Sequence, residues 1–218
     1  NFEQAIDAFK QALKIAREIG NKEGEIKCLI DLGVLYWNIG QMEQSSERYK
    51  QAVSLAKKIN LKDREGECLN ALEIYKLYKE GKRLRDLRVY QECIEKFRGA
   101  IDLARRIGSK EHEVKCLRQL GYTCWELNKL QELFSISKEA LKIAKSLNHR
   151  KETGRCLNNI GLYYWQLNYY SQALVNYNNA LEIASQEKNK IEEGICLNNI
   201  GIVYSDLGIY EKSLEYFL

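Results

Sequence analysis

The sequence predicts an all-helical protein in which antiparallel helix pairs stack into a solenoid, and three observations lead to this fold class. A Cys-Leu pair recurs in one register, at Cys28, Cys68, Cys116, Cys156 and Cys196. Successive pairs are about 40 residues apart, except that the step from Cys68 to Cys116 is eight residues longer, and two series of alanines follow the same steps. Each repeat holds two stretches whose apolar residues return every three or four positions, as on one face of a helix. Two helices in a repeat of this length indicate a helical repeat protein.

The first helix of each repeat is clearest in the segment CLNNIGLYYWQL, where Leu157, Ile160 and Tyr164 share one face. A glycine returns on that face in four repeats, at Gly33, Gly121, Gly161 and Gly201. Glycine inside a helix costs roughly 1 kcal/mol relative to alanine. Its return therefore predicts a close contact with the partner helix, and we expect the alanines of that helix to lie opposite.

The second helix of each repeat is clearest in SQALVNYNNALEIA, where Ala173, Tyr177 and Ala180 share a face. This helix ends at a glycine or an asparagine in one register, at Gly20, Asn60, Gly108 and Asn148. Both residue types accept the left-handed conformation that follows a helix C-terminus. Because the chain has no proline, we expect these caps to set the helix ends.

The repeat register divides the chain into units. We expect one solenoid over residues 1–218, made of a second helix at 1–21, complete repeats at 22–61, 62–109, 110–149 and 150–189, and an incomplete repeat at 190–218. The chain begins and ends inside amphipathic patterns, so we expect it to be a piece of a longer protein. Solenoid units bury their apolar faces only against neighbours, and we therefore expect both end units to expose apolar surface.

The most specific pattern in the first helices is Leu-Gly-x-x-Tyr. It occurs as Leu32, Gly33 and Tyr36, and in related form as Ile160, Gly161 and Tyr164 and as Ile200, Gly201 and Tyr204. With Ala173, Tyr177 and Ala180 in the second helix, the chain resembles the tetratricopeptide repeat family in a long form of about 40 residues. The resemblance implies a right-handed superhelical solenoid whose first helices line a concave groove. It specifies function poorly, because the family is a scaffold used with many partners.

The repeat at 62–109 departs from the pattern. Glu73 stands where other repeats have glycine, and eight extra residues fall near Lys82 to Val89. Eight residues are about two helical turns, so we expect the second helix of this repeat to begin two turns early. The insertion is basic, with Lys82, Arg83, Arg85 and Arg88. Cations at a helix N-terminus oppose the helix dipole. We interpret these residues either as a solvated extension or as a secondary docking patch for an acidic partner.

Three tryptophans occupy one repeat slot, namely Trp37, Trp125 and Trp165. Each follows the position that holds Tyr36 or its equivalent, so its side chain is rotated by about 100° around the helix. That slot either packs between neighbouring repeats or faces the groove as an apolar anchor. The sequence leaves both alternatives open.

Candidate polar ligand-binding residues also recur on the first helices. Asparagine is a poor helix former unless its amide is used, and pairs of asparagines stand at Asn158, Asn159, Asn198 and Asn199. By the resemblance, Asn159 and Asn199 hold the backbone of an extended peptide, with Asn158 and Asn198 nearby. One turn earlier, Lys27, Lys115 and Arg155 are placed to attract acidic groups of a ligand.

The remaining reactive side chains favour structural roles. All seven cysteines fall at packing positions, and the chain has no Cys-x-x-Cys pair, so we expect them to be reduced and mostly buried. The two histidines, His112 and His149, lie near turns between repeats, where we expect them to be solvated. No set of acid, base and nucleophile can be assembled from this pattern. We therefore expect no catalytic residue, no metal, no cofactor and no enzymatic activity.

Composition bounds the location and the partners. The chain lacks an apolar run long enough to span a membrane and opens without a basic and then apolar signal segment. Together with seven thiols expected to be reduced, this predicts a cytoplasmic protein without a membrane partner. A net charge of +4 is mild for this length.

The leading hypothesis is a scaffold or adaptor that binds a protein or an extended, partly acidic peptide in the concave groove, as the sensor or regulatory arm of a larger signalling protein. The alternative is a structural module that self-associates through uncapped ends. Nucleic-acid binding ranks below both, because no interleaved aromatic platform accompanies the basic residues.

Overall fold

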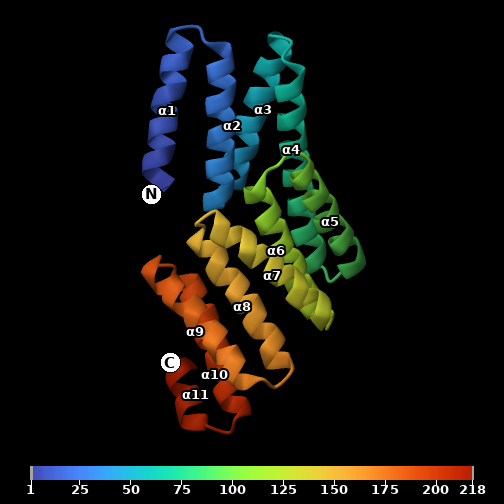
Figure 1. The fold of residues 1–218 in the computed structure, drawn as a ribbon, viewed down its shortest axis with the longest axis vertical. Coiled ribbons are helices and arrows are strands. Elements are labelled where there is room, and N and C mark those ends of the chain that lie inside the picture. The colour runs from blue at the N-terminus through green and yellow to red at the C-terminus, as the bar shows by residue number, and fades with distance from the viewer. Residues whose placement is uncertain (1, 218) are drawn as a thin grey trace.

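The computed structural model describes residues 2–217, and the regular elements of this part of the chain are eleven α-helices (Figure 1). They are α1 (Phe2–Glu18), α2 (Lys22–Ile39), α3 (Met42–Lys58), α4 (Lys62–Asp86), α5 (Tyr90–Arg106), α6 (Lys110–Glu126), α7 (Leu130–Ser146), α8 (Arg150–Gln166), α9 (Tyr170–Gln186), α10 (Lys190–Asp206) and α11 (Tyr210–Phe217). The all-helical prediction is confirmed. None of the helices in residues 2–217 has both the length and the apolar character needed to cross a membrane.

Each helix packs against the next one along the chain, in an antiparallel zigzag that begins with α1 against α2 (Figure 1). A second set of contacts joins first helices of successive hairpins, from α4 to α6, from α6 to α8 and from α8 to α10. The first helices therefore stand side by side and form one wall of the solenoid. The stack curves enough to bring the ring of Phe2 within 5.7 Å of the His149 ring.

A residue with positive φ stands in every turn between helices of the described chain. The predicted caps at Gly20, Asn60, Gly108 and Asn148 all have this conformation. The turns inside the hairpins use it too, mostly with glycine or asparagine. Two turns use other residues: Arg88, with φ 60°, inside a hairpin, and Lys188, with φ 54°, between two hairpins. These residues carry a Cβ in a conformation that disfavours it, so the turn geometry is imposed there by the flanking helices.

Three of the four recurring glycines face aromatic rings and Gly121 faces the hydroxyl of Ser137, so the prediction that alanines lie opposite them was wrong. A Cβ added at Gly33 would lie 2.8 Å from Cζ of Tyr49. The same modification at Gly201 would bring it 2.7 Å from Cε1 of Phe217, and at Gly161 it would meet the ring of Tyr177. In each case the ring follows the glycine at the same sequence separation. The missing side chain thus makes room for a ring of the second helix, and the rings of Tyr49 and Tyr177 are buried there.

A glycine–ring contact of the same kind shows where the eight extra residues lie. Gly81 faces the ring of Phe97, which follows it at that same separation, with an added Cβ only 2.9 Å from Cε1. The eight extra residues therefore precede Gly81 and lengthen the first helix, α4, to 25 residues, against 17 in α6. The second helix, α5, has the ordinary 17 residues. The expectation that the second helix begins early was wrong, because the glycine–ring contact keeps the hairpin in register.

The lengthened helix changes what α2 contacts. Eight residues advance a helix by about 12 Å, and the end of α2 packs on the start of α6, two hairpins away. Trp37 is fully buried there. Its Nε1 donates to the carbonyl of Glu111 at 3.2 Å, and its ring lies 4.5 Å from the His112 ring and 4.9 Å from that of Tyr78.

The burial of the side chains confirms the prediction for the cysteines but contradicts the one for the histidines. Six cysteines are buried and Cys28 is half-buried, all as free thiols, so the packing interpretation is confirmed. His112 and His149 are also buried, at 1% and 6% exposure, so the expectation that they are solvated was wrong. The curvature of the solenoid covers these turns with α2 and with the start of α1. Burial and the nearby Lys115 lower the pKa of His112 to about 3.

Candidate functional site

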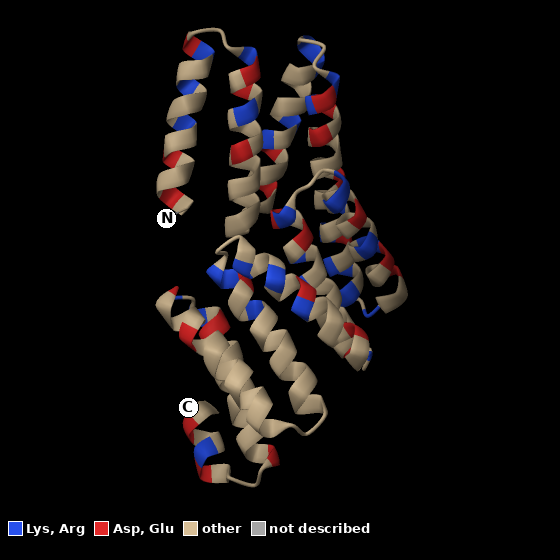
Figure 2. Ribbon diagram, viewed as in Figure 1, with Lys and Arg blue, Asp and Glu red and all other residues tan. Residues whose placement is uncertain are grey.

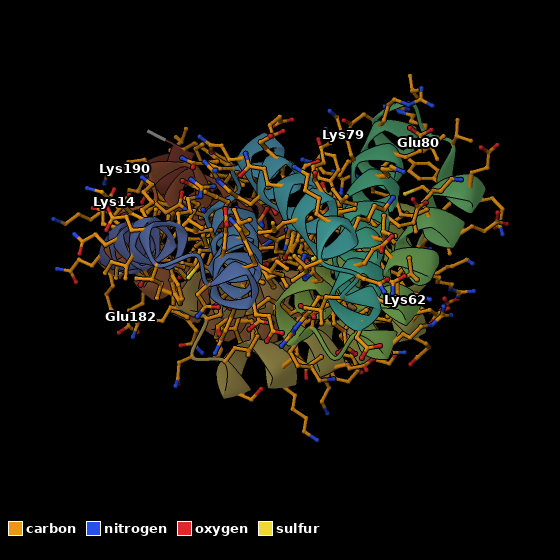
Figure 3. The ribbon with its side chains drawn as sticks, turned by 90° about the horizontal axis from the view of Figure 1, so that it is seen from above. Lys14, Lys62, Lys79, Glu80, Glu182 and Lys190 are labelled. Carbon is orange, nitrogen blue, oxygen red and sulfur yellow. The ribbon has the colours of Figure 1, made fainter. Side chains whose placement is uncertain are left out.

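A groove of about 1280 Å³ runs along the first helices α4, α6, α8 and α10. On α6 it is lined by Lys115, Arg118, Gln119 and Tyr122. The other three helices contribute the equivalent positions of their own repeats, such as Lys82 on α4 and Leu162 on α8. Figure 3 places Lys79 of α4 and Lys190 of α10, two other lining residues, toward the same side of the molecule.

A ladder of amide hydrogen bonds ties the first helices together along the groove. Gln119 donates to the Tyr78 hydroxyl at 3.0 Å, and Asn159 donates to the Arg118 carbonyl at 3.1 Å. Asn199 donates to Oδ1 of Asn158 at 2.8 Å. Each donor stands 41 residues after its acceptor. One of the two amide N–H donors of Asn159 and of Asn199 is thus used in a bond between repeats, although both side chains line the groove.

Asn198 differs from these three amides. It is exposed, it lines the groove, and its side chain makes no hydrogen bond to any residue from 2 to 217. An asparagine amide can both donate to and accept from a peptide backbone. Among the asparagines singled out on α8 and α10, Asn198 is consequently the one whose full hydrogen-bonding capacity is available to the groove.

The tryptophan slot divides between the two alternatives that the sequence leaves open. Trp37 is in the core and belongs to the contact between α2 and α6. Trp125 and Trp165 are half-buried and line the groove. Nε1 of Trp165 donates to Asp206 on α10 at 2.6 Å, which fixes the orientation of the ring.

The three predicted cations occupy three different environments. Lys27 is exposed and lies outside the groove lining, on α2. Lys115 is 3% exposed, and its Nζ donates to the carbonyls of Trp37 and of Asn38, the latter at 3.0 Å. Burial, offset in part by Glu152, lowers the pKa of Lys115 to about 7. Lys115 therefore caps the end of α2, where the Trp37 carbonyl also accepts from the Gly40 backbone N–H. Arg155, by contrast, faces the groove with a side chain that is 26% exposed.

Beneath the groove lies an ion-pair network centred on the fully buried Glu152. Its carboxylate accepts from Nε of Arg118 at 2.7 Å and from Nη1 of Arg155 at 3.0 Å. Arg155 also pairs with Glu192 at 2.6 Å. Burial alone would raise the pKa of Glu152, but Arg118, Arg155 and Lys115 outweigh it and hold this pKa at about 2. The network fixes both guanidinium groups between α6, α8 and α10.

The four basic residues of the expected insertion do not form one patch. Lys82 lines the groove, and Arg83 pairs with Glu80 at 2.6 Å. Arg85 is bonded to Gln119, and its guanidinium lies 5.1 Å from the Tyr122 ring centre. Arg88 holds the turn after α4. Arg83 and Arg85 lie in the last turn of α4, so they complement the helix dipole instead of opposing it.

The groove is cationic overall. Eight lysines and arginines line it, against three carboxylates. Figure 2 shows lysine and arginine near the start of α8, while the later part of α8 and most of α9 are tan and thus carry no charge. The α10 end of the groove adds exposed apolar side chains, with Ile191 and Ile195 exposed at 76% and 42%, beside polar ones such as Asn198. The groove thus joins a cationic centre to an end that mixes apolar and polar side chains.

Sequence reasoning missed several groove residues, among them Tyr75, Tyr78, Arg118, Lys151 and Ile195. The signal that identifies most of them is the repeat itself. Ile195 stands one repeat after Arg155, and Arg118 stands one repeat before Asn158. Because the sequence already singles out Arg155 and Asn158, their equivalents could have been inferred. Tyr75 and Tyr78 become visible only when the extra turns are placed before Gly81.

The fold and the groove define a helical-hairpin repeat protein. Sequence models of the tetratricopeptide repeat match residues 1–58 and 154–187. These matches assign two segments of the chain to the tetratricopeptide repeat family, whose domains typically serve as protein-binding modules. No curated protein sequence matches the chain.

Solved structures share the fold at low sequence identity. BtubC from P. vanneervenii superposes with a TM-score of 0.59 at 16% identity, over 99% of this chain and 88% of that one. A signal transduction ATPase with a tetratricopeptide repeat sensor, from Pyrococcus horikoshii, also gives 0.59, at 18% identity, over 98% of this chain and 32% of that one. A Rap protein complexed with competence and sporulation factor gives 0.50 at 15% identity, over 100% and 68%.

Proposed function

We propose that the chain is a binding module that holds an extended segment of another protein in the groove. The observation that carries this proposal is the continuity of the groove across four successive first helices. Its volume of about 1280 Å³ exceeds the roughly 300–1,000 Å³ of ordinary small-molecule pockets. A groove of this length suits several residues of an extended chain better than one compact ligand.

The lining supplies what such a segment needs. Trp125 and Trp165 offer partly open aromatic faces, and aromatic anchors dominate the energetics of many interfaces. Asn198 offers a free amide for a peptide backbone. The excess of cations favours a segment that carries acidic residues, since complementary charge speeds association. The module would therefore take a partly acidic, extended peptide with apolar side chains toward the α10 end.

The structural neighbours support a regulatory setting for this module. One of them is a repeat sensor within a signal transduction ATPase, and another is a Rap protein in complex with competence and sporulation factor. We propose by analogy that this chain is the sensor or adaptor arm of a larger signalling protein, without enzymatic activity of its own.

The test is a binding measurement on variants of groove residues. An array of short peptides of varied charge is screened against the wild-type chain, and the strongest binder is measured by fluorescence anisotropy. Trp165→Ala should weaken this peptide by about 2 kcal/mol and Asn198→Ala by about 1 kcal/mol. Tyr169→Ala is the matched control, because Tyr169 is an exposed aromatic residue outside the groove lining. Circular dichroism must show unchanged helicity.

Affinity that survives both groove substitutions, or that falls equally in Tyr169→Ala, would show that the groove is the wrong surface. The Asn159→Ala variant is less informative, since its side chain also bonds α8 to α6. It should lose unfolding free energy as well as affinity.

Self-association is a second candidate function, favoured by the exposed apolar face of α11. Tyr210, Leu214 and Phe217 are 67%, 58% and 49% exposed. Sedimentation velocity over a hundredfold range of concentration tests it. Association that Leu214→Glu abolishes and Trp165→Ala leaves unchanged would support this alternative, and a concentration-independent monomer would remove it.

A further inference from the structure

Four cations from three helices converge on the centre of the groove: Lys82 of α4, Arg118 of α6, and Lys151 and Arg155 of α8. Lys82 is exposed and Lys151 is half-buried, and both line the same groove as the two arginines. Arg118 and Arg155 bind the same Glu152 carboxylate, which holds their guanidinium groups close together. Desolvation and the charges of these arginines lower the pKa of Lys82 and that of Lys151, while Asp86 opposes the effect on Lys82 and Glu152 and Glu192 oppose it on Lys151.

Their ion-pair partners differ. Arg118 and Arg155 are held by Glu152 and Glu192. Lys82 and Lys151 form no ion pair with any carboxylate of residues 2–217. Like charges gathered in one groove repel one another. Both lysines therefore add positive charge beside Arg118 and Arg155 and keep it available for an anion.

The guanidinium of Arg118 is held in place and still has free hydrogen-bond donors. In Arg118 only Nε is engaged by a carboxylate, and no hydrogen bond within residues 2–217 uses its two terminal nitrogens. Its side chain is 13% exposed, and the planar guanidinium is held by the buried Glu152. Such a fixed guanidinium pairs well with an oxyanion, and a lysine adds a mobile point charge beside it.

We propose that Lys82, Arg118, Lys151 and Arg155 form an anion site in the middle of the groove that takes a doubly charged oxyanion group of the bound segment. Two chemical groups supply such charge on a peptide, namely a phosphorylated side chain and two adjacent carboxylates. The inference rests on the proposed function for the peptide, but the anion site itself is tested without one.

The first experiment uses inorganic pyrophosphate as the probe, with titration calorimetry at constant ionic strength. Wild-type chain should bind it, and Lys82→Gln and Lys151→Gln should each weaken binding about tenfold. Lys190→Gln is the matched control: Lys190 also lines the groove, but it already pairs with Glu193 at 2.6 Å. It should change pyrophosphate affinity less than twofold.

A second readout separates a binding role from a structural one. Without anion, Lys82→Gln and Lys151→Gln should unfold at the same Tm as the wild type or at a higher one, because each removes a repelled charge. With pyrophosphate, the wild type should gain in Tm and the double variant should not. If the double variant binds pyrophosphate as the wild type does, or if both single variants lower Tm without anion, the site is refuted.

Peptides distinguish the two sources of charge. The strongest binder from the array is prepared with serine, phosphoserine or a Glu-Glu pair at each position in turn. Tighter binding of the phosphoserine or of the Glu-Glu peptide, lost in the double lysine variant, supports the site and identifies the group. No gain over serine at any position refutes it. If pyrophosphate binds through both lysines while no peptide binds, the proposed function fails and the anion site stands.

Discussion

Replacing Gly161 by alanine tests the contact that fixes the hairpin register. An added Cβ would lie 2.6 Å from Cδ1 of Tyr177 and closer still to Cε1, and the ring is 1% exposed. Overpacking of this kind costs about 1–3 kcal/mol, while alanine in place of a helical glycine gains roughly 1 kcal/mol. The net change should therefore be a loss of up to about 2 kcal/mol of unfolding free energy.

The chain contains a matched control for this substitution. Gly194 lies in α10, and no heavy atom would come within 4 Å of its added Cβ. Gly194→Ala should therefore stabilise the fold by roughly 1 kcal/mol. Urea unfolding followed by circular dichroism measures both, as opposite shifts of the midpoint. In a Tyr177→Leu background, the penalty of Gly161→Ala should shrink, which a double-mutant cycle reports as a coupling energy.

Equal stabilisation by Gly161→Ala and Gly194→Ala would refute this reasoning. It would mean that the ring of Tyr177 moves aside at no cost. The assignment of the eight extra residues to α4, which depends on the equivalent contact of Gly81 with Phe97, would then lose its physical basis.

Three further results are expected. The unfolding free energy of the wild type should fall by roughly 3 kcal/mol as the pH falls from about 5 toward 2, because the pKa of Glu152 is about 2 in the folded chain and returns toward 4.5 on unfolding. In the same acid titration, Glu152→Gln should lose less unfolding free energy. Lys188→Gly should raise the unfolding free energy by about 1 kcal/mol by relieving a positive φ, measured by thermal melts, with destabilisation as the contrary result. Native thiol titration should label Cys28 before the six buried cysteines, and rapid labelling of five or more thiols would contradict the packing.

The helical hairpins and their caps follow from the sequence because the repeat can be compared with itself. A single asparagine or glycine at a possible helix end says little, but Gly20, Asn60, Gly108 and Asn148 stand in one register. All four have positive φ in the structure. Local conformation imposes this requirement, so a local pattern is sufficient to predict it.

The position of the insertion could not be read from the same series. The Cys-Leu pair fixes the register before it, at Cys68, and the alanine series fixes the register after it, at Ala100. Any position between them satisfies both. The contact that decides it joins Gly81 to Phe97 across the hairpin. The spacing of that pair becomes a recognisable pattern only once Gly33 and Tyr49, which stand equally far apart, are known to touch. The burial of His112 depends on a contact between residues still farther apart in the sequence. Trp37 of α2 packs on the His112 ring and donates to the carbonyl of Glu111, 74 residues away.

The tryptophan slot shows why equivalence between repeats predicts a helix face but not its environment. With the extra turns placed before Gly81, this slot holds Trp37, Arg85, Trp125 and Trp165 in four successive first helices. Trp37 is sealed in the core because the lengthened α4 displaces the next hairpin and lets α6 pack on α2. Trp125 and Trp165 have neighbours at the ordinary offset and stay on the groove. The insertion consequently marks where the groove begins: α2 contributes only its C-terminal end, and most of the groove lining belongs to α4, α6, α8 and α10.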